Sequence, residues 1–265
     1  MPTILITNDD GIDSPGLKAA AEAVSSLGTI IVIAPSSQQT GMGRGLVGEK
    51  DLCLLTIEYH LNGKNIEAYH CNCSPALIVR HSLRTILKTM KPDLLISGIN
   101  YGENLGINIT SSGTVGAALE GASFGIPSIA ISKQTDISSH HRYTEQDWGT
   151  SVHFLEKFSK SMMGASLPSD VDILKIDIPD GASTLTKWEF TTLARSGYYS
   201  KKIINPSLKS KLGDGKTVIE VDESNLDQRS DIYAIFRKKV VSVTPISLDL
   251  TSRTDFDELK DRIAP

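Results

Sequence analysis

The first part of the chain alternates continuous apolar runs with segments of helical periodicity. Residues 3–7 form a short apolar run, and residues 29–34 are continuously apolar and β-branched, as in strands buried on both faces of a sheet. Between them, apolar residues recur at helical spacing over residues 17–27, after Ser14-Pro15, a pair typical of a helix start. This β-α-β order predicts a right-handed crossover and a parallel sheet.

The same alternation continues to about residue 182. It predicts strands at 93–97, 128–132 and 173–178, and helices at 74–90, 113–124 and about 144–163. Two strand-like runs around Asn62-Gly63 predict a β-hairpin inserted at about 51–71. We therefore expect an α/β fold, with a Rossmann-like, mostly parallel sheet flanked by helices in a catalytic core of residues 1–182.

From about residue 183 the pattern changes to short alternating strands separated by polar loops. One of these strands is predicted at 233–236, and a short terminal helix at 254–263. The polar segment 200–211 is expected to protrude. We therefore predict that residues 183–265 are a β-rich C-terminal extension and the oligomerisation region.

Composition narrows the class of protein. With 40% hydrophobic residues and a formal net charge of −4, the 265-residue chain can bury a full core and shows no electrostatic sign of binding nucleic acid or a membrane. The three cysteines match no common zinc or disulfide framework, which favours reduced thiols. The chain lacks a secretory leader pattern and a long apolar span, so we expect a cytoplasmic location.

Asp9 and Asp10 are the first candidates for chemistry, because they follow the first predicted strand directly. Two adjacent carboxylates repel unless one is protonated or a cation binds both. Thr40 and Asn100 follow other predicted strands and would reach the same sheet edge. Such an all-oxygen set suits Mg²⁺ or Mn²⁺ better than Zn²⁺. The alternative is that Asp10-Gly11 is only a β-turn, and an isolated Asp-Asp-Gly favours that alternative.

A second candidate site lies at Ser112-Gly113-Thr114, which precedes a predicted helix. The free N–H groups and hydroxyls of such a helix start are suited to a phosphoryl group, and a capping role is compatible with this. The first turn has no G-x-G-x-x-G motif, and the chain has neither a P-loop nor a G-x-S-x-G elbow, which disfavours dinucleotide binding and hydrolase-elbow chemistry. His140 and His141 are predicted to be solvated surface residues.

Taken together, several blocks of sequence resemble the SurE survival-protein family of metal-dependent 5′-nucleotidases. The resemblance spans nearly the whole chain, and the order and spacing of its blocks are more specific than any one of them. The blocks are ITNDDGIDSPG (6–16), AP (34–35), SGINYGENLG (97–106), SGTV (112–115), IPSIAIS (126–132) and VTPISLD (243–249).

The resemblance implies that Asp9, Asp10, Thr40 and Asn100 hold one divalent cation per subunit, Mg²⁺ or Mn²⁺. The family usually has serine where this chain has Thr40, and threonine keeps the oxygen but stiffens the side chain. The resemblance also implies nucleoside 5′-monophosphates as substrates, and a homodimer or homotetramer formed through the C-terminal β-rich region.

The mechanism implied is hydrolysis by an activated water. Asp9 or Asp10 would orient or deprotonate the water, while Asn104, Ser112, Gly113 and Thr114 would bind the phosphate and stabilise its charge. Asn104 thus counts with the two aspartates as catalytic. Two alternatives stay open: a non-catalytic nucleotide or metal sensor, and a phosphatase acting mainly on short polyphosphate or other phosphomonoesters. Base preference is not predicted.

Overall fold

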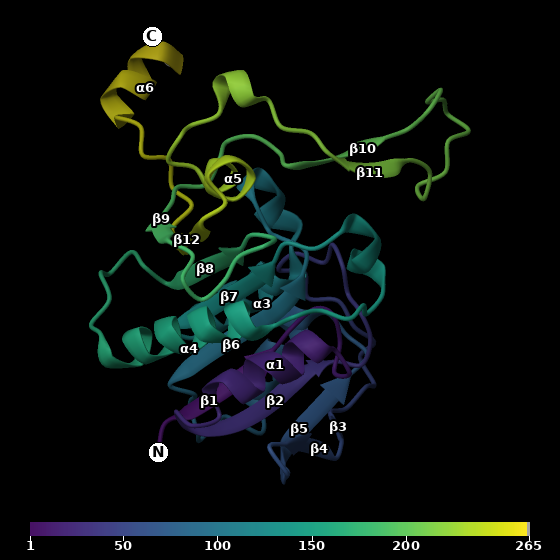
Figure 1. The fold of residues 1–265 in the computed structure, drawn as a ribbon, viewed down its shortest axis with the longest axis vertical. Helices are drawn as coiled ribbons and strands as arrows, with labels where there is room; N and C mark the ends of the chain where they lie inside the picture. Colours follow the sequence, from purple (N-terminus) through teal and green to yellow (C-terminus); the bar gives the residue numbers. More distant parts are fainter. Residues whose placement is uncertain (264–265) are drawn as a thin grey trace.

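The structure, a computed structural model, describes residues 1–263, and within these residues ten strands form one central sheet (Figure 1). Its strand order is β3-β5-β2-β1-β6-β7-β8-β12-β9, with β4 paired to β5. The strands of this sheet are β1 (Thr3–Thr7), β2 (Thr29–Pro35), β3 (Leu55–Thr56), β4 (Tyr59–Leu61), β5 (Lys64–Cys71), β6 (Leu94–Tyr101), β7 (Ser128–Lys133), β8 (Ile173–Ile178), β9 (Trp188–Phe190) and β12 (Val241–Ile246). A separate two-stranded sheet consists of β10 (Tyr199–Lys202) and β11 (Lys216–Ile219).

Helices cover both faces of this sheet, which confirms the predicted α/β class. Ile4 and Ile6 of β1 face the core shared with α1 and α4, whereas Leu5 faces the core shared with α2 and α3, as the two-residue period of a strand requires. The helices are α1 (Pro15–Val24), α2 (Pro75–Arg84), α3 (Gly113–Ala122), α4 (Gly149–Gly164), α5 (Asp231–Tyr233) and α6 (Phe256–Ile263).

The Ser-Pro helix starts and the Asn-Gly turn are confirmed, whereas the helix predicted from about residue 144 begins only at Gly149. Ser14 and Ser74 are the N-cap residues of α1 and α2, each followed by proline at the first helical position. Asn62 and Gly63 have positive φ angles of 50° and 76° and connect β4 to β5, so the predicted hairpin is confirmed. The helix predicted at 74–90 ends earlier, at Arg84.

The order of strands in the sheet reverses at β1, and the candidate site lies at this reversal. β2 pairs with one edge of β1 and β6 with the other, and both pairings are parallel. The connections leaving the carboxyl ends of β1 and β6 therefore diverge to opposite sides of the sheet and leave a crevice. In open α/β sheets such a switch point is where ligands bind.

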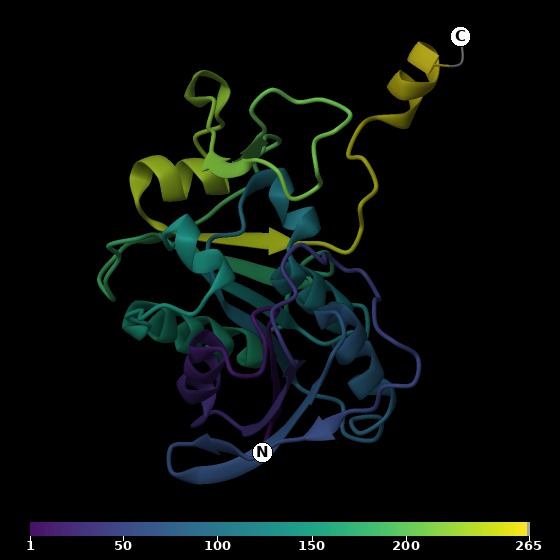
Figure 2. The ribbon, with the colours of Figure 1, turned by 90° about the vertical axis from the view of Figure 1, so that its right-hand side faces the viewer.

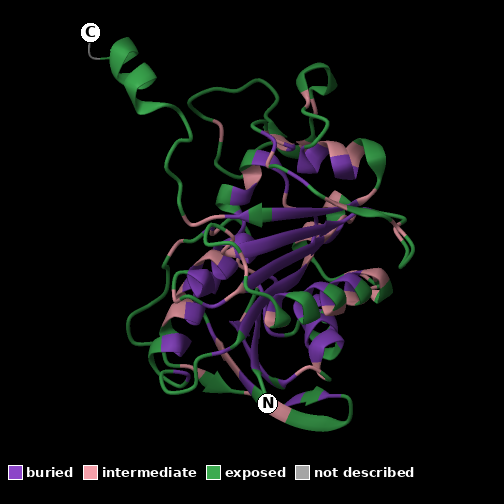
Figure 3. Ribbon diagram, turned by 90° about the vertical axis from the view of Figure 1, so that its left-hand side faces the viewer, coloured by how far each residue is buried: buried purple, intermediate pink, exposed green. Residues whose placement is uncertain are grey.

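The C-terminal part both extends the sheet and projects from it. β12 pairs antiparallel with β8, and β9 pairs parallel with β12, whereas β10 and β11 form a separate hairpin that projects from the body (Figure 1). The boundary at residue 182 therefore stays a prediction, because the main sheet continues across it. α6 lies on an extended arm away from the body (Figure 2), and it is exposed along its whole length (Figure 3).

The strand predicted at 233–236 is wrong, because the chain there is helical. α5 is followed by a π-helical turn at Ala234–Lys238, and the Ser230 hydroxyl caps α5 by accepting a hydrogen bond from the Tyr233 N–H at 3.2 Å. Ile232 and Ile235 are three residues apart and pack into one buried cluster, so helical spacing outweighed the strand-like composition. No helix within residues 1–263 is long and apolar enough to span a membrane.

Candidate active site

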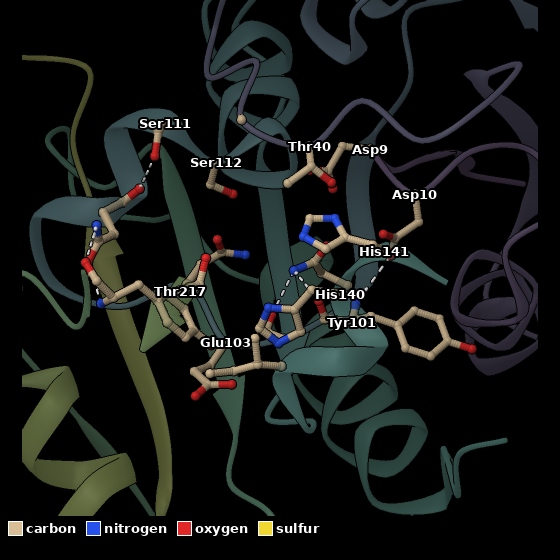
Figure 4. Close-up of a pocket in the computed structure, with 17 residues that line it drawn as sticks. Asp9, Asp10, Thr40, Tyr101, Glu103, Ser111, Ser112, His140, His141 and Thr217 are labelled. Carbon is tan, nitrogen blue, oxygen red and sulfur yellow. Dashed lines mark hydrogen bonds between the residues drawn. The ribbon is translucent and has the colours of Figure 1, made fainter. Parts of the chain in front are cut away.

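The turn after β1 places two carboxylates at the switch point. The Asn8 side chain closes this turn by exchanging two hydrogen bonds of 3.1 Å with the backbone of Gly11. Asp9 and Asp10 are only 6% and 2% exposed, and both line a cavity of about 210 Å³ (Figure 4). The paired carboxylates predicted from the sequence therefore share one largely buried site.

Burial makes this pair reluctant to ionise. Burial raises the pKa of Asp9 to about 6, although its Oδ1 accepts a 2.5 Å hydrogen bond from the Thr114 hydroxyl. The pKa of Asp10 rises to about 7 through burial and then through repulsion by Asp9, against hydrogen bonds from Tyr101 N–H (3.2 Å) and the Gln38 amide (3.1 Å). Among residues 1–263, no basic side chain forms a salt bridge with either carboxylate, so the site offers negative charge to an incoming cation.

Thr40 and Asn100 line the same cavity, as predicted. The Asn100 amide nitrogen donates to the backbone carbonyls of Tyr101 (3.3 Å) and Gly102 (2.7 Å), which leaves its Oδ1 available to a cation. The strand register between β6 and β7 shifts between Ser97 and Asn100, and such an irregularity redirects a side chain at the end of a strand.

The chemistry of these oxygen donors fits a hard divalent cation. Two carboxylates, a hydroxyl and an amide oxygen match the preference of Mg²⁺ and Mn²⁺. In the described part of the chain, no three His, Cys, Asp or Glu side chains cluster as a metal site. A cation here would consequently depend on Thr40, Asn100 and water as well as on Asp9 and Asp10.

The start of α3 lies directly against Asp9. Ser112 lines the cavity and caps the helix, because its Oγ accepts the N–H of Val115 at 3.2 Å. Gly113 allows the close approach, since a Cβ there would lie 2.7 Å from the Asp9 Cβ. Gly113 and Thr114 are not among the residues that line the cavity: Thr114 is fully buried behind Asp9.

Asn104 also lines the cavity and comes from the loop after β6. Its side-chain nitrogen donates to the Ser132 hydroxyl at 2.8 Å, which holds the amide group in place. An amide nitrogen carries two hydrogens, so a second donor remains for an anion. The structure thus brings six of the eight predicted residues to one cavity: Asp9, Asp10, Thr40, Asn100, Asn104 and Ser112.

Other residues of the cavity were missed by sequence reasoning. The surface assignment is wrong for His140, which is half-buried, lines the cavity and meets the Tyr199 ring edge-on at 5.6 Å between centroids. Burial lowers the His140 pKa, and within residues 1–263 its Nε2 has no hydrogen-bond partner. Gln38 ties this segment to the site by donating to the His140 carbonyl (2.7 Å) as well as to Asp10. Gln38 lies in a loop, His140 in a short 3₁₀ helix and Tyr199 in the separate β10–β11 hairpin, and no local pattern indicates that they meet.

The fold and site define a class: a doubly wound α/β protein with an acidic, oxygen-rich crevice at its switch point and a helix N-terminus beside it. Residues 4–200 match the family described as "Survival protein SurE". The chain belongs to the SurE family, which confirms the family predicted from the sequence.

Relatives of known name cover almost the entire chain. "5′-nucleotidase SurE" of Methanosarcina acetivorans is 37% identical, with 98% of this chain and 97% of that protein aligned. "5′-nucleotidase SurE" of Thermococcus gammatolerans is 36% identical, with 97% and 94% aligned. The crystal structure of the SurE protein from Aquifex aeolicus superposes with a TM-score of 0.77 at 32% identity, covering 98% of this chain and 99% of that one.

Proposed function

We propose that this protein is a divalent-metal-dependent phosphomonoesterase that hydrolyses nucleoside 5′-monophosphates to nucleoside and phosphate. The observation that carries the proposal is the buried pair Asp9 and Asp10, without a basic partner in the described residues, beside the N-terminus of α3. The 5′-nucleotidase name of its relatives supports the same activity. Neither alternative, a non-catalytic sensor or a polyphosphatase, has an observation of its own in its favour.

Asp9, Asp10, Thr40 and Asn100 would hold one Mg²⁺ or Mn²⁺ ion. When bound, such an ion supplies positive charge that stabilises the phosphate and makes a nearby water more acidic. The Thr114 hydroxyl fixes one oxygen of Asp9, and the Tyr101 N–H and Gln38 fix both oxygens of Asp10. Each carboxylate is therefore held in one orientation before substrate binds.

Groups of the protein itself would bind the phosphate and orient the attacking water. The start of α3 at Ser112 and the amide of Asn104 would hold the phosphate oxygens, where charge increases as the ester bond breaks. Asp9 or Asp10 would orient the attacking water and accept its proton, since both line the cavity with the candidate phosphate-binding residues. His140 and Tyr199 line the same cavity and would contact the nucleoside.

The assembly is part of the proposal. α6 carries Phe256 and Ile263, which are 63% and 71% exposed, on an arm away from the body (Figure 3). Exposed apolar side chains on one helix are typical of a subunit contact. We propose a homodimer or homotetramer formed through residues 183–265; the cytoplasmic location also stays a prediction.

The test is a phosphate-release assay on a panel of nucleoside 5′-monophosphates, 3′-monophosphates, short polyphosphate and a simple phosphomonoester, repeated with Mg²⁺, Mn²⁺ and a chelator. We expect release from 5′-monophosphates that the chelator abolishes. Asp9→Asn should lose this activity, whereas Asp13→Asn, which changes an exposed carboxylate of the same turn, should keep it. Ligand binding without phosphate release would establish the sensor alternative instead.

A further inference from the structure

Three charged side chains are fully buried beneath the candidate site and play no part in the proposed chemistry. Lys175 and Asp177 lie two residues apart on β8, so they point to the same face of the sheet, and Asp231 comes from α5. All three side chains have zero exposure. The Lys175 Nζ forms salt bridges with Asp177 and, at 3.2 Å, with Asp231 Oδ2.

These three residues, the charged triad, form hydrogen bonds with the backbone of the loop that contains Asn104. The Asn104 N–H donates to Asp177 Oδ1 at 2.8 Å, and the Asn104 carbonyl accepts a hydrogen bond from Lys175 Nζ at 2.8 Å. Two residues later, the Gly106 N–H donates to Asp231 Oδ2 at 3.0 Å. Both backbone groups of Asn104 are therefore held by charged side chains, although the residue lies outside any helix or strand.

The triad also joins the C-terminal part of the chain to this loop. Asp231 Oδ1 accepts the N–H of Ala194 at 3.0 Å, so one carboxylate links residues 106, 175 and 194. The three hydrogens of the Lys175 ammonium are used by the Asn104 carbonyl and the two carboxylates. The lysine thus has no donor left for a substrate.

Stability alone is a weak reason for such a cluster. Removing three charges from water is unfavourable, and apolar side chains of similar size often stabilise a core as well or better. What an apolar cluster cannot do is hold the N–H and the C=O of one loop residue at the same time. The cluster therefore fixes the position of the backbone at Asn104, a residue that lines the cavity.

We propose that Lys175, Asp177 and Asp231 are positioning residues that act through Asn104 and set its amide against the phosphate. The inference rests on the proposed function, in which Asn104 binds the phosphate. It implies that the C-terminal part of the chain, through Asp231, completes the active site of its own subunit. A shift of about 1 Å in a positioned group can lower the rate by about a hundredfold.

The experiment compares Asp177→Leu, which removes the acceptor for the Asn104 N–H, with Asp177→Asn, which keeps an oxygen there. We expect Asp177→Leu to lower kcat/KM by about 10- to 100-fold and to weaken inhibition by inorganic phosphate, and Asp177→Asn to restore most of both. Stabilisation of the protein by Mn²⁺ should change little, because Asp9 and Asp10 are untouched. If Asp177→Leu does not fold, Asp231→Ala, which removes the acceptor for the Gly106 N–H, serves as the second variant, with effects in the same direction.

Asp172→Leu is the matched control. Asp172 lies just before β8, at the opposite end of that strand from Asp177 and away from the cavity. Its Oδ2 accepts a hydrogen bond of 2.7 Å from the Leu248 N–H. This variant should lose stability with unchanged inhibition by phosphate. An equal effect of Asp177→Leu and Asp172→Leu on phosphate inhibition, or no effect of Asp177→Leu and of Asp231→Ala, would overturn the proposal.

A double-mutant cycle with Asn104→Ala separates the positioning role from the function on which it rests. If the triad acts through Asn104, then Asp177→Leu adds little to the loss already caused by Asn104→Ala. Fully additive losses contradict the positioning role. Wild-type activity of Asn104→Ala alone contradicts the role assigned to Asn104 itself, while leaving the metal-dependent activity of the wild type to be judged by the phosphate-release assay.

Discussion

Asp9 and Asp10 bind protons and a cation in competition, which makes the effect of metal depend on pH. Their pKa values in the folded protein, about 6 and about 7, lie above the ordinary value of 3.8, so Asp9 is mainly charged above about pH 6 and Asp10 only above about pH 7. As the pH falls through these values, protons occupy the oxygens that a cation needs. We expect the rise in Tm caused by Mn²⁺ to be large at about pH 8 and to shrink towards about pH 5.5.

Thermal unfolding with and without Mn²⁺ at several pH values measures this effect. Asp9→Asn is the control, because it should show a small rise in Tm at every pH. A rise that grows as the pH falls would be incompatible with cation binding by these carboxylates.

The close contact between Gly113 and Asp9 can be tested by substitution of the glycine. In Gly113→Ala the new Cβ would lie 2.7 Å from the Asp9 Cβ and 2.8 Å from its Oδ2, so the carboxylate or the helix start must move. We expect kcat/KM to fall by about 10- to 100-fold. Gly164→Ala is the matched control in α4, where a Cβ meets nothing within 4 Å. Steady-state kinetics of both variants, with circular dichroism to confirm folding, make the comparison, and equal activity of the two would contradict the tight contact.

At the residue scale, the sequence predicts the positions that depend only on where strands end. Asp9, Asp10 and Asn100 each lie at the end of a buried parallel strand, and the geometry of a parallel sheet is enough to bring them together. The placement of Thr114 behind Asp9 depends on how far α3 slides towards β1, which no local pattern encodes. His140 was missed because only tertiary contacts, such as the Gln38 hydrogen bond, bring its loop over the cavity.

Among the elements, the β10–β11 hairpin reaches the cavity from outside the main sheet. It contributes Tyr199 and Thr217 to a cavity otherwise built from the loops of the main sheet. Tyr199→Ala should raise KM for nucleoside 5′-monophosphates by about tenfold, equivalent to about 1.4 kcal/mol, through loss of an aromatic contact.

The comparison substrate for Tyr199→Ala is glycerol phosphate, which has no base to contact the ring. Its KM should stay near the wild-type value. Equal losses for both substrates would show that Tyr199 shapes the whole cavity and not the nucleoside end.

Element prediction succeeded where one pattern dominated and failed where two competed. β1, β2 and β8 each pair with a neighbouring strand on both edges, and their predicted positions match the structure closely. Residues 233–236 combine strand-forming composition with helical spacing of Ile232 and Ile235, and packing against Tyr198 and Leu105 favoured the helix. Those contacts join distant parts of the chain, so a short window of sequence cannot reveal them.

At the scale of the whole molecule, we expect the exposed arm that carries α6 to form part of the contact between subunits. Phe256 and Leu259 are 63% and 38% exposed on the same short helix. The double variant Phe256→Glu and Leu259→Glu should shift the protein towards monomer in sedimentation velocity, because charge at an apolar contact opposes association. Leu55→Glu, at a residue of β3 that is 56% exposed and lies outside residues 183–265, is the control and should leave the assembly intact. An unchanged assembly in the α6 variant would exclude this arm as the contact.

The link from Asp231 to the loop at Gly106 spans 125 residues of sequence, and it has a consequence for synthesis on the ribosome. At about 5–20 residues per second, a nascent chain takes roughly 6 to 25 s to extend from the loop to the aspartate that fixes it. During that interval the first strands and both carboxylates have left the exit tunnel, while Asp231, the last of the three side chains that hold the loop, is still missing. We expect a stalled chain ending before α5 to be inactive even when its parallel strands have formed, so that hydrolysis begins only after Asp231 has been added.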